Sequence, residues 1–279
     1  MLDSSCGNRR IVIGKRGQCP DCGQAYERRT YEGRLTAWTP VCGCLDKRIA
    51  AERKRLCEDA VRRIRQDRIA ELLEQARLGP RFAEATFEGY HDRPGTRRAY
   101  LEARALVEHW PERSKRGEGL LLIGPWGTSK SFLAAAIVNA LVKRGMSAVF
   151  QSVPDLLRRF RATYDPSSAV SESAILDALA EADLLVLDDL GAERWTEWTE
   201  SQLYQVIDAR YRWRRPLVVT TNLQLGGEIE NTIGYRTMDR LVEMCRMIET
   251  SGPSLRVMQA EARKRQEQAS GEGLKANEA

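Results

Sequence analysis

The 279-residue sequence lacks any long hydrophobic run. No apolar stretch reaches the roughly 20 residues that a membrane-spanning helix requires. The basic start, Met1 to Gly17, also lacks the apolar core of a secretory signal peptide. These two absences argue against a membrane protein and against a secreted one. We therefore expect a cytoplasmic protein without membrane contact.

Histidine is also scarce, because the chain has only His91 and His109. Both lie far downstream of the cysteines near the amino terminus, so we do not expect histidine ligands for a metal there. The chain has seven cysteines. In a reducing compartment they predict metal ligands or free thiols rather than disulfides.

Four of these cysteines form two close pairs, Cys19 with Cys22 and Cys42 with Cys44. Four thiolates at this spacing suit one tetrahedral zinc ion, with each pair in a tight turn. Such a zinc ion would be structural, because four protein ligands leave no open position for chemistry. The alternative is a set of free or redox-active thiols.

The surroundings of the pairs support a small module. Gly23 and Gly43 suit the tight turns, and the segment between the pairs is expected to form a short β-hairpin or ribbon. Cys6 and Cys57 are the substitute ligands, whereas Cys245 has the sequence context of an ordinary buried cysteine.

The remaining composition is that of a folded protein, with 42% hydrophobic residues and a formal net charge of +5. The length fits one large domain plus a smaller module. The positive charge mildly favours a nucleic-acid partner.

The strongest motif is the apolar run Leu120–Ile123, followed by a turn-rich loop and then by Lys130 and Ser131. Strand, loop and helix in this order are what a phosphate-binding loop requires. Backbone amides and the helix start would face the phosphates, Lys130 would reach the β- and γ-phosphates, and Ser131 would bind Mg²⁺.

A second apolar run, 182–187, ends in the paired carboxylates Asp188 and Asp189. Asp188 is expected to hold the metal, as in a Walker B strand, and Asp189 to polarise an attacking water. Ser129 departs from the motif, because it stands where a glycine would let the backbone approach phosphate closely. This predicts weaker or reshaped nucleotide binding and slow turnover; the alternative is a chance loop between strand and helix.

Apolar segments and amphipathic segments alternate after Gly119. Strands are predicted at 119–123, 147–151, 183–188, 216–221 and 245–249, and helices at about 130–144, 153–163, 172–182, 198–212 and 234–244. A further amphipathic helix is predicted before them, over 96–110. This alternation predicts an α/β fold with a parallel sheet covered by helices on both faces.

The rest of the chain divides into three parts. Residues 1–45 are the expected zinc-binding module, and 46–94 are a basic helix ending at Gly79-Pro80 and a linker that packs onto the core domain of 95–258. Residues 259–279 are a charged tail, expected to begin as a helix and then to become largely disordered. The basic face of the helix is either a solvated surface with ion pairs or a contact for a protein or nucleic acid.

Polar residues that follow the later strands complete the expected site. Thr221 or Asn222 is placed to orient a water or to touch the γ-phosphate, unless they only cap the following turn. Arg236 and Arg240 share one helix face and suit an arginine finger acting on a neighbouring subunit; the alternative is surface salt bridges. Arg256 is a weaker candidate for a phosphate contact within its own subunit.

The segments 184–193, 201–211 and 218–222 resemble the DnaC-type helicase loaders, AAA+ ATPases related to the IstB transposition helpers. Segment 234–244 resembles the arginine-finger segment of that group. The cysteine module, the basic helix and segment 79–87 resemble the zinc-containing front end of many bacterial and phage loaders. The resemblance covers about 19 to 258 and implies a P-loop AAA+ core without the carboxyl-terminal lid of larger relatives.

The resemblance also implies roles for individual residues. Asp189 takes the position of a catalytic glutamate, Asn222 senses the γ-phosphate, and Arg236 or Arg240 is the finger. The full set of residues expected at the nucleotide is Gly124, Pro125, Trp126, Gly127, Thr128, Ser129, Lys130, Ser131, Phe132 and Arg256, with Ser131 and Asp188 at Mg²⁺. Asp189 has a shorter reach than glutamate, which predicts slow hydrolysis.

The expected function is that of an ATP-dependent loader that self-associates through ATP, binds a hexameric replicative helicase and places it on single-stranded DNA. Its cofactors would be ATP, Mg²⁺ and structural zinc. A transposition helper that binds a transposase and DNA is the main alternative, because it uses the same core. A small-metabolite kinase and a nucleotide-dependent adaptor without hydrolysis are further alternatives; the kinase would leave the zinc module and the Arg236 segment without a role.

Overall fold

The computed structural model describes residues 11–19, 21–31, 34–40, 43–72 and 78–276. The chain divides into two compact units, Met1–Arg63 and Ile64–Ala279, which are described separately. No helix in the described parts of the chain is long and apolar enough to cross a membrane.

The first unit contains a small antiparallel sheet in the order β1-β2-β3. Its strands are β1 (Ile11–Gln18), β2 (Ala25–Tyr31) and β3 (Arg34–Pro40). Strands β2 and β3 are the hairpin expected between the cysteine pairs. Strand β1 was not expected, although its run Ile11-Val12-Ile13 is β-branched throughout and therefore favours a strand.

The long basic helix is α1 (Cys44–Leu72). Its polar side chains form ion pairs one helical turn apart, such as Lys54 with Glu58, as expected for a solvated face. The described part of α1 ends at Leu72, and residues 73–77, which lead to the predicted end at Gly79-Pro80, lie outside the described residues. Pro80 starts α2 (Pro80–Ala83), because proline suits the first position of a helix.

The second unit is built on a five-stranded sheet in the order β5-β6-β7-β4-β8, and every pair is parallel. The strands are β4 (Gly119–Ile123), β5 (Ala148–Ser152), β6 (Leu184–Leu190), β7 (Leu217–Thr221) and β8 (Cys245–Glu249). The α/β prediction is confirmed, and each strand lies within two residues of its predicted position.

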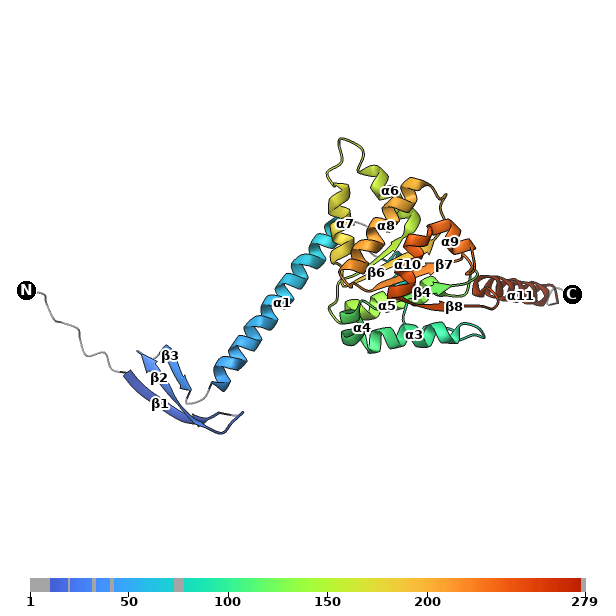
Figure 1. Ribbon diagram of the computed structural model, residues 1–279. Helices are drawn as coiled ribbons and strands as arrows, with labels where there is room; N and C mark the ends of the chain where they lie inside the picture. Colours follow the sequence, from blue (N-terminus) through green and yellow to red (C-terminus); the bar gives the residue numbers. More distant parts are fainter. Residues whose placement is uncertain (1–10, 20, 32–33, 41–42, 73–77, 277–279) are drawn as a thin grey trace, which may run out of the picture. The chain divides into compact units, whose positions relative to one another are not determined.

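Helices cover both faces of this sheet (Figure 1). Successive residues of β4 alternate between two apolar cores, as the two-residue period of a strand requires. Leu120 and Leu122 pack with the α3, α4 and α5 side, whereas Leu121 and Ile123 pack with helices α6 to α10. The sheet is therefore the middle layer of three.

The helices follow the predicted order with three differences. They are α3 (Arg97–Glu108), α4 (Trp110–Arg116), α5 (Lys130–Lys143), α6 (Val153–Ala162), α7 (Glu172–Glu181), α8 (Glu197–Arg212), α9 (Glu228–Ile233), α10 (Tyr235–Met244) and α11 (Leu255–Ala276). Helices α4 and α9 were not predicted.

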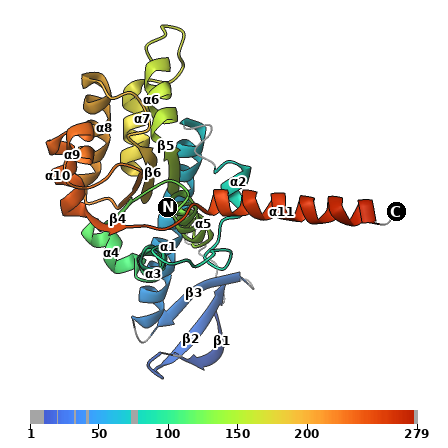
Figure 2. The same ribbon diagram turned by 90° about the vertical axis from the view of Figure 1, so that its right-hand side faces the viewer.

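The third difference concerns the tail after residue 258. It begins as a helix, as predicted, and this helix, α11, continues to Ala276, farther than predicted; α11 projects from the layered body (Figure 2). The run 259–268 consists mostly of alanine, glutamate, glutamine, arginine and lysine, which are strong helix formers.

Candidate nucleotide-binding site

The phosphate-binding loop connects β4 to α5 at the carboxyl end of the sheet. Strand β4 lies between β7 and β8, and the order of the sheet reverses here, where open parallel sheets bind ligands. Gly124 and Gly127 both have positive φ. A Cβ atom on Gly124 would lie 2.1 Å from the Thr250 carbonyl oxygen, and one on Gly127 would lie 2.0 Å from Ser254 Oγ. Only glycine fits at these two positions.

Lys130 is the first residue of α5, and its side chain is held inside the loop. The ammonium donates hydrogen bonds to the carbonyl oxygens of Gly124 (2.7 Å) and Pro125 (2.9 Å) and to Asn222 Oδ1 (2.9 Å). Burial lowers the pKa of Lys130 to about 8, although Asp189 and Asp188 oppose the shift. Lys130 and Asn222, far apart in sequence, therefore meet at one point.

The two carboxylates at the end of β6 are oriented by a β-bulge. The pairing of β6 with β7 shifts register between Leu187 and Leu190, and Asp189 has a φ of 57°. A bulge allows successive side chains to be directed at one site. Asp188 is buried and accepts a hydrogen bond from Thr220 Oγ1 (2.6 Å). The Asp189 amide in turn donates a hydrogen bond to Thr220 Oγ1 (3.0 Å).

The environment of Asp188 disfavours its charge. Burial raises the pKa of Asp188 to about 6, and the nearby Asp189 carboxylate adds to the effect, whereas hydrogen bonds from Thr220 and Ser131 oppose it. A buried carboxylate beside the Ser131 hydroxyl is a pair of hard oxygen ligands of the kind that Mg²⁺ prefers.

A cavity of about 270 Å³ opens over the loop. Seven of the residues expected at the nucleotide line it together with Asp189 and Asn222. Those seven are Trp126, Gly127, Ser129, Lys130, Ser131, Phe132 and Arg256, the last from the start of α11.

Part of the cavity wall was not expected from the sequence. Arg81, Phe82, Tyr90 and His91 line it from the segment before α3. Asn139 of α5 fixes this segment, because its amide donates hydrogen bonds to backbone oxygens that include those of Phe82 and Ala85. The only signal in the sequence is the three aromatic residues of an otherwise polar linker, and the linker packs onto the core domain as predicted.

Some predicted residues lie outside the cavity. Thr128 is buried, with its hydroxyl bonded to the Pro125 carbonyl and to Thr250, so it shapes the loop from behind. Thr221 is buried and bonds to the Leu190 carbonyl oxygen and the Leu223 amide, as expected for a residue that caps the turn. Gly124 and Pro125 contribute backbone oxygens to Lys130 and do not line the cavity wall.

The two candidate finger arginines lie on α10, away from the cavity of their own chain. Arg236 is exposed and has no ion pair among the described residues. Arg240 is half-buried, pairs with Asp208 (3.4 Å) and lies over the Tyr211 ring at 4.3 Å. The alternative of a surface ion pair therefore describes Arg240, whereas Arg236 is available to another molecule.

The residues around the loop fit a nucleotide with Mg²⁺. Two glycines that tolerate no Cβ let the backbone approach the phosphates, and the lysine at the helix start supplies positive charge for them. A serine hydroxyl beside a buried carboxylate supplies oxygen ligands for Mg²⁺. The residues that would hold the metal are Ser131 and Asp188.

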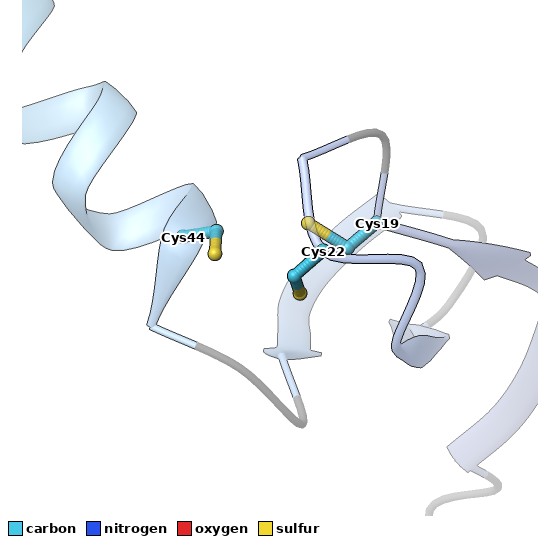
Figure 3. Close-up of side chains that lie close together, drawn as sticks. All are labelled: Cys19, Cys22 and Cys44. Atoms are coloured by element: carbon cyan, nitrogen blue, oxygen red, sulfur yellow. The ribbon is translucent and has the colours of Figure 1, made fainter.

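The described cysteines of the first unit form a possible zinc site. The Sγ atoms of Cys19, Cys22 and Cys44 all lie within 4.8 Å of one another. Figure 3 shows the three side chains close together, with Cys44 on the first turn of α1. The turn that carries Cys19 and Cys22 is closed by a bond from the Gly23 amide to the Cys19 carbonyl (2.8 Å). Three thiolates at this spacing fit a zinc ion.

The remaining cysteines are not part of this cluster of described residues. The expected fourth ligand, Cys42, and the substitute Cys6 lie outside the described residues. Cys57 lies on the exposed side of α1 and is not part of the cluster. Cys245 is buried as predicted, its thiol donates to the Leu217 carbonyl oxygen (3.4 Å), and burial raises its pKa.

Comparison with known proteins gives consistent matches. A family model described as IstB-like ATP binding protein matches residues 56–263. The uncharacterized protein YdaV of Escherichia coli K12 is 31% identical over 192 residues, which cover 68% of this chain and 75% of YdaV. The replicative helicase loader DnaC of the same strain is 31% identical over 165 residues, which cover 59% of this chain and 65% of DnaC.

A solved structure gives the same result. The crystal structure of the DnaC helicase loader superimposes with a TM-score of 0.55 at 26% identity, covering 62% of this chain and all of that one. The family model, the curated relatives and the solved structure agree. The chain therefore belongs to the IstB-like ATP-binding protein family and carries an AAA+ P-loop core.

Proposed function

We propose that this protein is an ATP-dependent loader that binds a replicative DNA helicase and helps to place it on single-stranded DNA. The observation that carries the proposal is the similarity of its ATPase core to DnaC, at 31% identity over 165 residues. The cavity over the phosphate-binding loop, with Lys130, Asn222 and Asp189 in one place, supports the nucleotide part of the proposal.

The residues of the loop have the following roles in this proposal. Lys130 exchanges its backbone carbonyl partners for the phosphates. Asn222 responds to bound phosphate because its side-chain oxygen accepts a hydrogen bond from the same ammonium. Ser131 and Asp188 hold Mg²⁺, which supplies positive charge for phosphoryl transfer. Asp189 orients a water, and its short side chain makes hydrolysis slow.

We place the intersubunit contact on α10. Arg236 is exposed and unpaired among described residues, so it is the better finger of the two arginines. It would reach the phosphates of a neighbouring copy, which makes self-association depend on ATP. Arg240 would support it from the same helix face.

For single-stranded DNA we propose the outer face of α6 and the adjoining Trp198. Arg161 is exposed, makes no ion pair with any residue in the described ranges, and lies 4.8 Å from the Trp198 ring centre. Tyr164 is exposed and accepts a bond from Trp198 Nε1 (2.8 Å). Cations interleaved with aromatic rings suit a strand whose phosphates and bases both need partners.

We propose that the cysteine module carries structural zinc and, with α1, grips the helicase. Cys19, Cys22 and Cys44 supply three ligands, and Cys42 is the fourth. The second candidate function is an IstB-like transposition helper that binds a transposase and DNA, favoured by the description of the matching family.

Affinity capture from the native host distinguishes the two candidate functions. The chain and its Lys130→Ala variant are captured with and without ATP, and the retained proteins are identified by mass spectrometry. Recovery of a hexameric replicative helicase that depends on ATP and on Lys130 is the expected result. Recovery of a transposase instead would assign the ATPase to transposition.

A further inference from the structure

Ser129 occupies a backbone conformation that normally requires glycine. Its φ is 67° and its ψ is 22°, in the left-handed region. Side chains other than glycine and, to a lesser degree, asparagine and aspartate are disfavoured there. The phosphate-binding loop therefore keeps the shape that a glycine would give it, and this shape requires a stabilising contact.

Arg93 supplies that contact from a distant segment. Its Nη2 atom donates to Ser129 Oγ (2.8 Å) and to the Gly127 carbonyl oxygen (3.3 Å). Its Nη1 atom donates to the carbonyl oxygen of Pro253 (2.9 Å). One guanidinium thus connects the second half of the loop to the segment that precedes α11.

The backbone around Arg93 is fixed by close packing. The Ser251 amide donates to the Gly95 carbonyl oxygen (3.0 Å), and a Cβ atom on Gly95 would lie 2.2 Å from Ser251 Oγ. The Leu255 amide donates to the Gly127 carbonyl oxygen (3.0 Å). The position of the guanidinium is therefore set by the second unit itself and does not depend on a bound molecule.

We propose that Arg93 is a positioning residue for nucleotide binding, which acts through the Ser129 hydroxyl to hold the phosphate-binding loop in its binding shape. This inference rests on the proposed nucleotide binding. Arg93 and Ser129 together do what the missing glycine does in the usual motif. Lys130 and the amides of the loop then converge on the phosphates.

Three single variants test the pair by titration with the fluorescent nucleotide mant-ADP and Mg²⁺. Ser129→Ala keeps the Cβ atom and loses the hydroxyl, so we expect about tenfold weaker binding, the value of a hydrogen bond to a charged group. Arg93→Ala is expected to weaken binding by at least as much. Ser129→Gly removes both the strain and the need for the anchor, so its affinity should stay within about twofold of wild type.

The double variants show whether the two residues act together. Arg93→Ala should cost little more affinity in the Ser129→Ala background, and clearly less in the Ser129→Gly background than in wild type. Arg97→Ala is the control, because Arg97 is exposed and, among the residues that the structure describes, pairs with Asp92 alone. A structural role alone would instead lower the unfolding midpoint of every Arg93 variant and leave affinity equal in the folded protein.

The outcomes separate this inference from the proposed function. Equal affinities for wild type, Ser129→Ala and Ser129→Gly would overturn the role of the pair, as would an Arg93→Ala effect that is the same in all three backgrounds. If wild type binds no nucleotide, or binds it as well as Lys130→Ala does, the proposed function itself fails. The Ser129 variants keep the test valid if Arg93→Ala does not fold.

Discussion

Lys130 and Asp188 are ionisable side chains that the fold buries at the expense of their charge. Burial lowers the pKa of Lys130 to about 8 and raises that of Asp188 to about 6. Neither arrangement favours the folded protein by itself. Both become favourable when phosphates and Mg²⁺ bring the opposite charges, so the site stores part of its binding energy as electrostatic destabilisation.

Asp188→Asn should stabilise the protein in the absence of Mg²⁺. The pKa of Asp188 is raised from 3.8 to about 6, so its contribution to stability is lost as the pH rises through 6. The asparagine keeps the acceptor for Thr220 and carries no charge. We expect about 1–3 kcal/mol more unfolding free energy at pH 8 in EDTA, shrinking as the pH falls toward 4.

Denaturant unfolding at pH 8 and pH 4.5 measures this difference. Asp177→Asn is the control, because Asp177 lies exposed on α7 and should change stability by no more than about 0.5 kcal/mol. An Asp188→Asn protein less stable than wild type at pH 8 would show that the buried carboxylate is favourable as it stands.

Nucleotide binding should take up a proton at Lys130 above neutral pH. With a pKa of about 8, the amine is partly neutral at pH 8.5, and bound phosphates restore its charge. We expect uptake of roughly half a proton or more at pH 8.5 and little from Lys130 at pH 7. Calorimetry in buffers of different ionisation enthalpy measures it, and Lys130→Arg, always charged, should lose the difference between the two pH values. The same uptake at both pH values would contradict the assignment.

Some residues of the candidate site can be predicted from the sequence, and others cannot. Lys130, Ser131 and Asp188 belong to local motifs whose spacing fixes their neighbours. Arg93 contacts Ser129 across 36 positions, and no local pattern indicates such a pair. The bulge that orients Asp188 and Asp189 arises from the pairing of β6 with β7, and the sequence of β6 alone does not indicate it.

At the scale of elements, the Arg210 side chain ties α8 to the amino end of the sheet. Arg210 is fully buried and donates hydrogen bonds to the carbonyl oxygens of Leu179, Ala182 and Pro216. It therefore satisfies carbonyl groups at the end of α7 that would otherwise be buried without partners.

Arg210→Met should destabilise the second unit by about 2–4 kcal/mol, because several buried carbonyl oxygens lose their donor at once. Arg212→Ala is the matched control on the same helix; Arg212 is exposed and pairs with Asp208, so its removal should cost no more than about 0.5 kcal/mol. Denaturant unfolding compares the two. Equal effects would contradict the role given to Arg210.

The elements of the core were predictable because their signals are local. The strands are short, mostly apolar runs between turn residues, and β4 and β7 are buried along their whole length. Helix α4 was missed because Pro111 and a run of charged residues resemble a loop. The propensity of the residues in α11 outweighs the polar composition that predicts disorder.

At the scale of the whole molecule, the two units should respond separately to loss of metal. The cysteine cluster lies in the first unit and the nucleotide cavity in the second. We expect about one zinc per chain by elemental analysis, lost in Cys19→Ser and retained in Cys57→Ser. Both variants should keep mant-ADP binding. Zinc retained by Cys19→Ser at the wild-type level would contradict the proposed ligand set.

In the proposed function, ATP bound at Lys130 controls the transfer of a helicase to DNA. The most direct test of this control is a reconstituted loading assay with this chain, the replicative helicase of its host and circular single-stranded DNA coated with single-strand-binding protein. The amount of helicase that stays on the DNA after gel filtration is measured with and without ATP. We predict loading by wild type with ATP and background levels for Lys130→Ala. Equal loading by both proteins, or no loading by wild type, would contradict the proposed function.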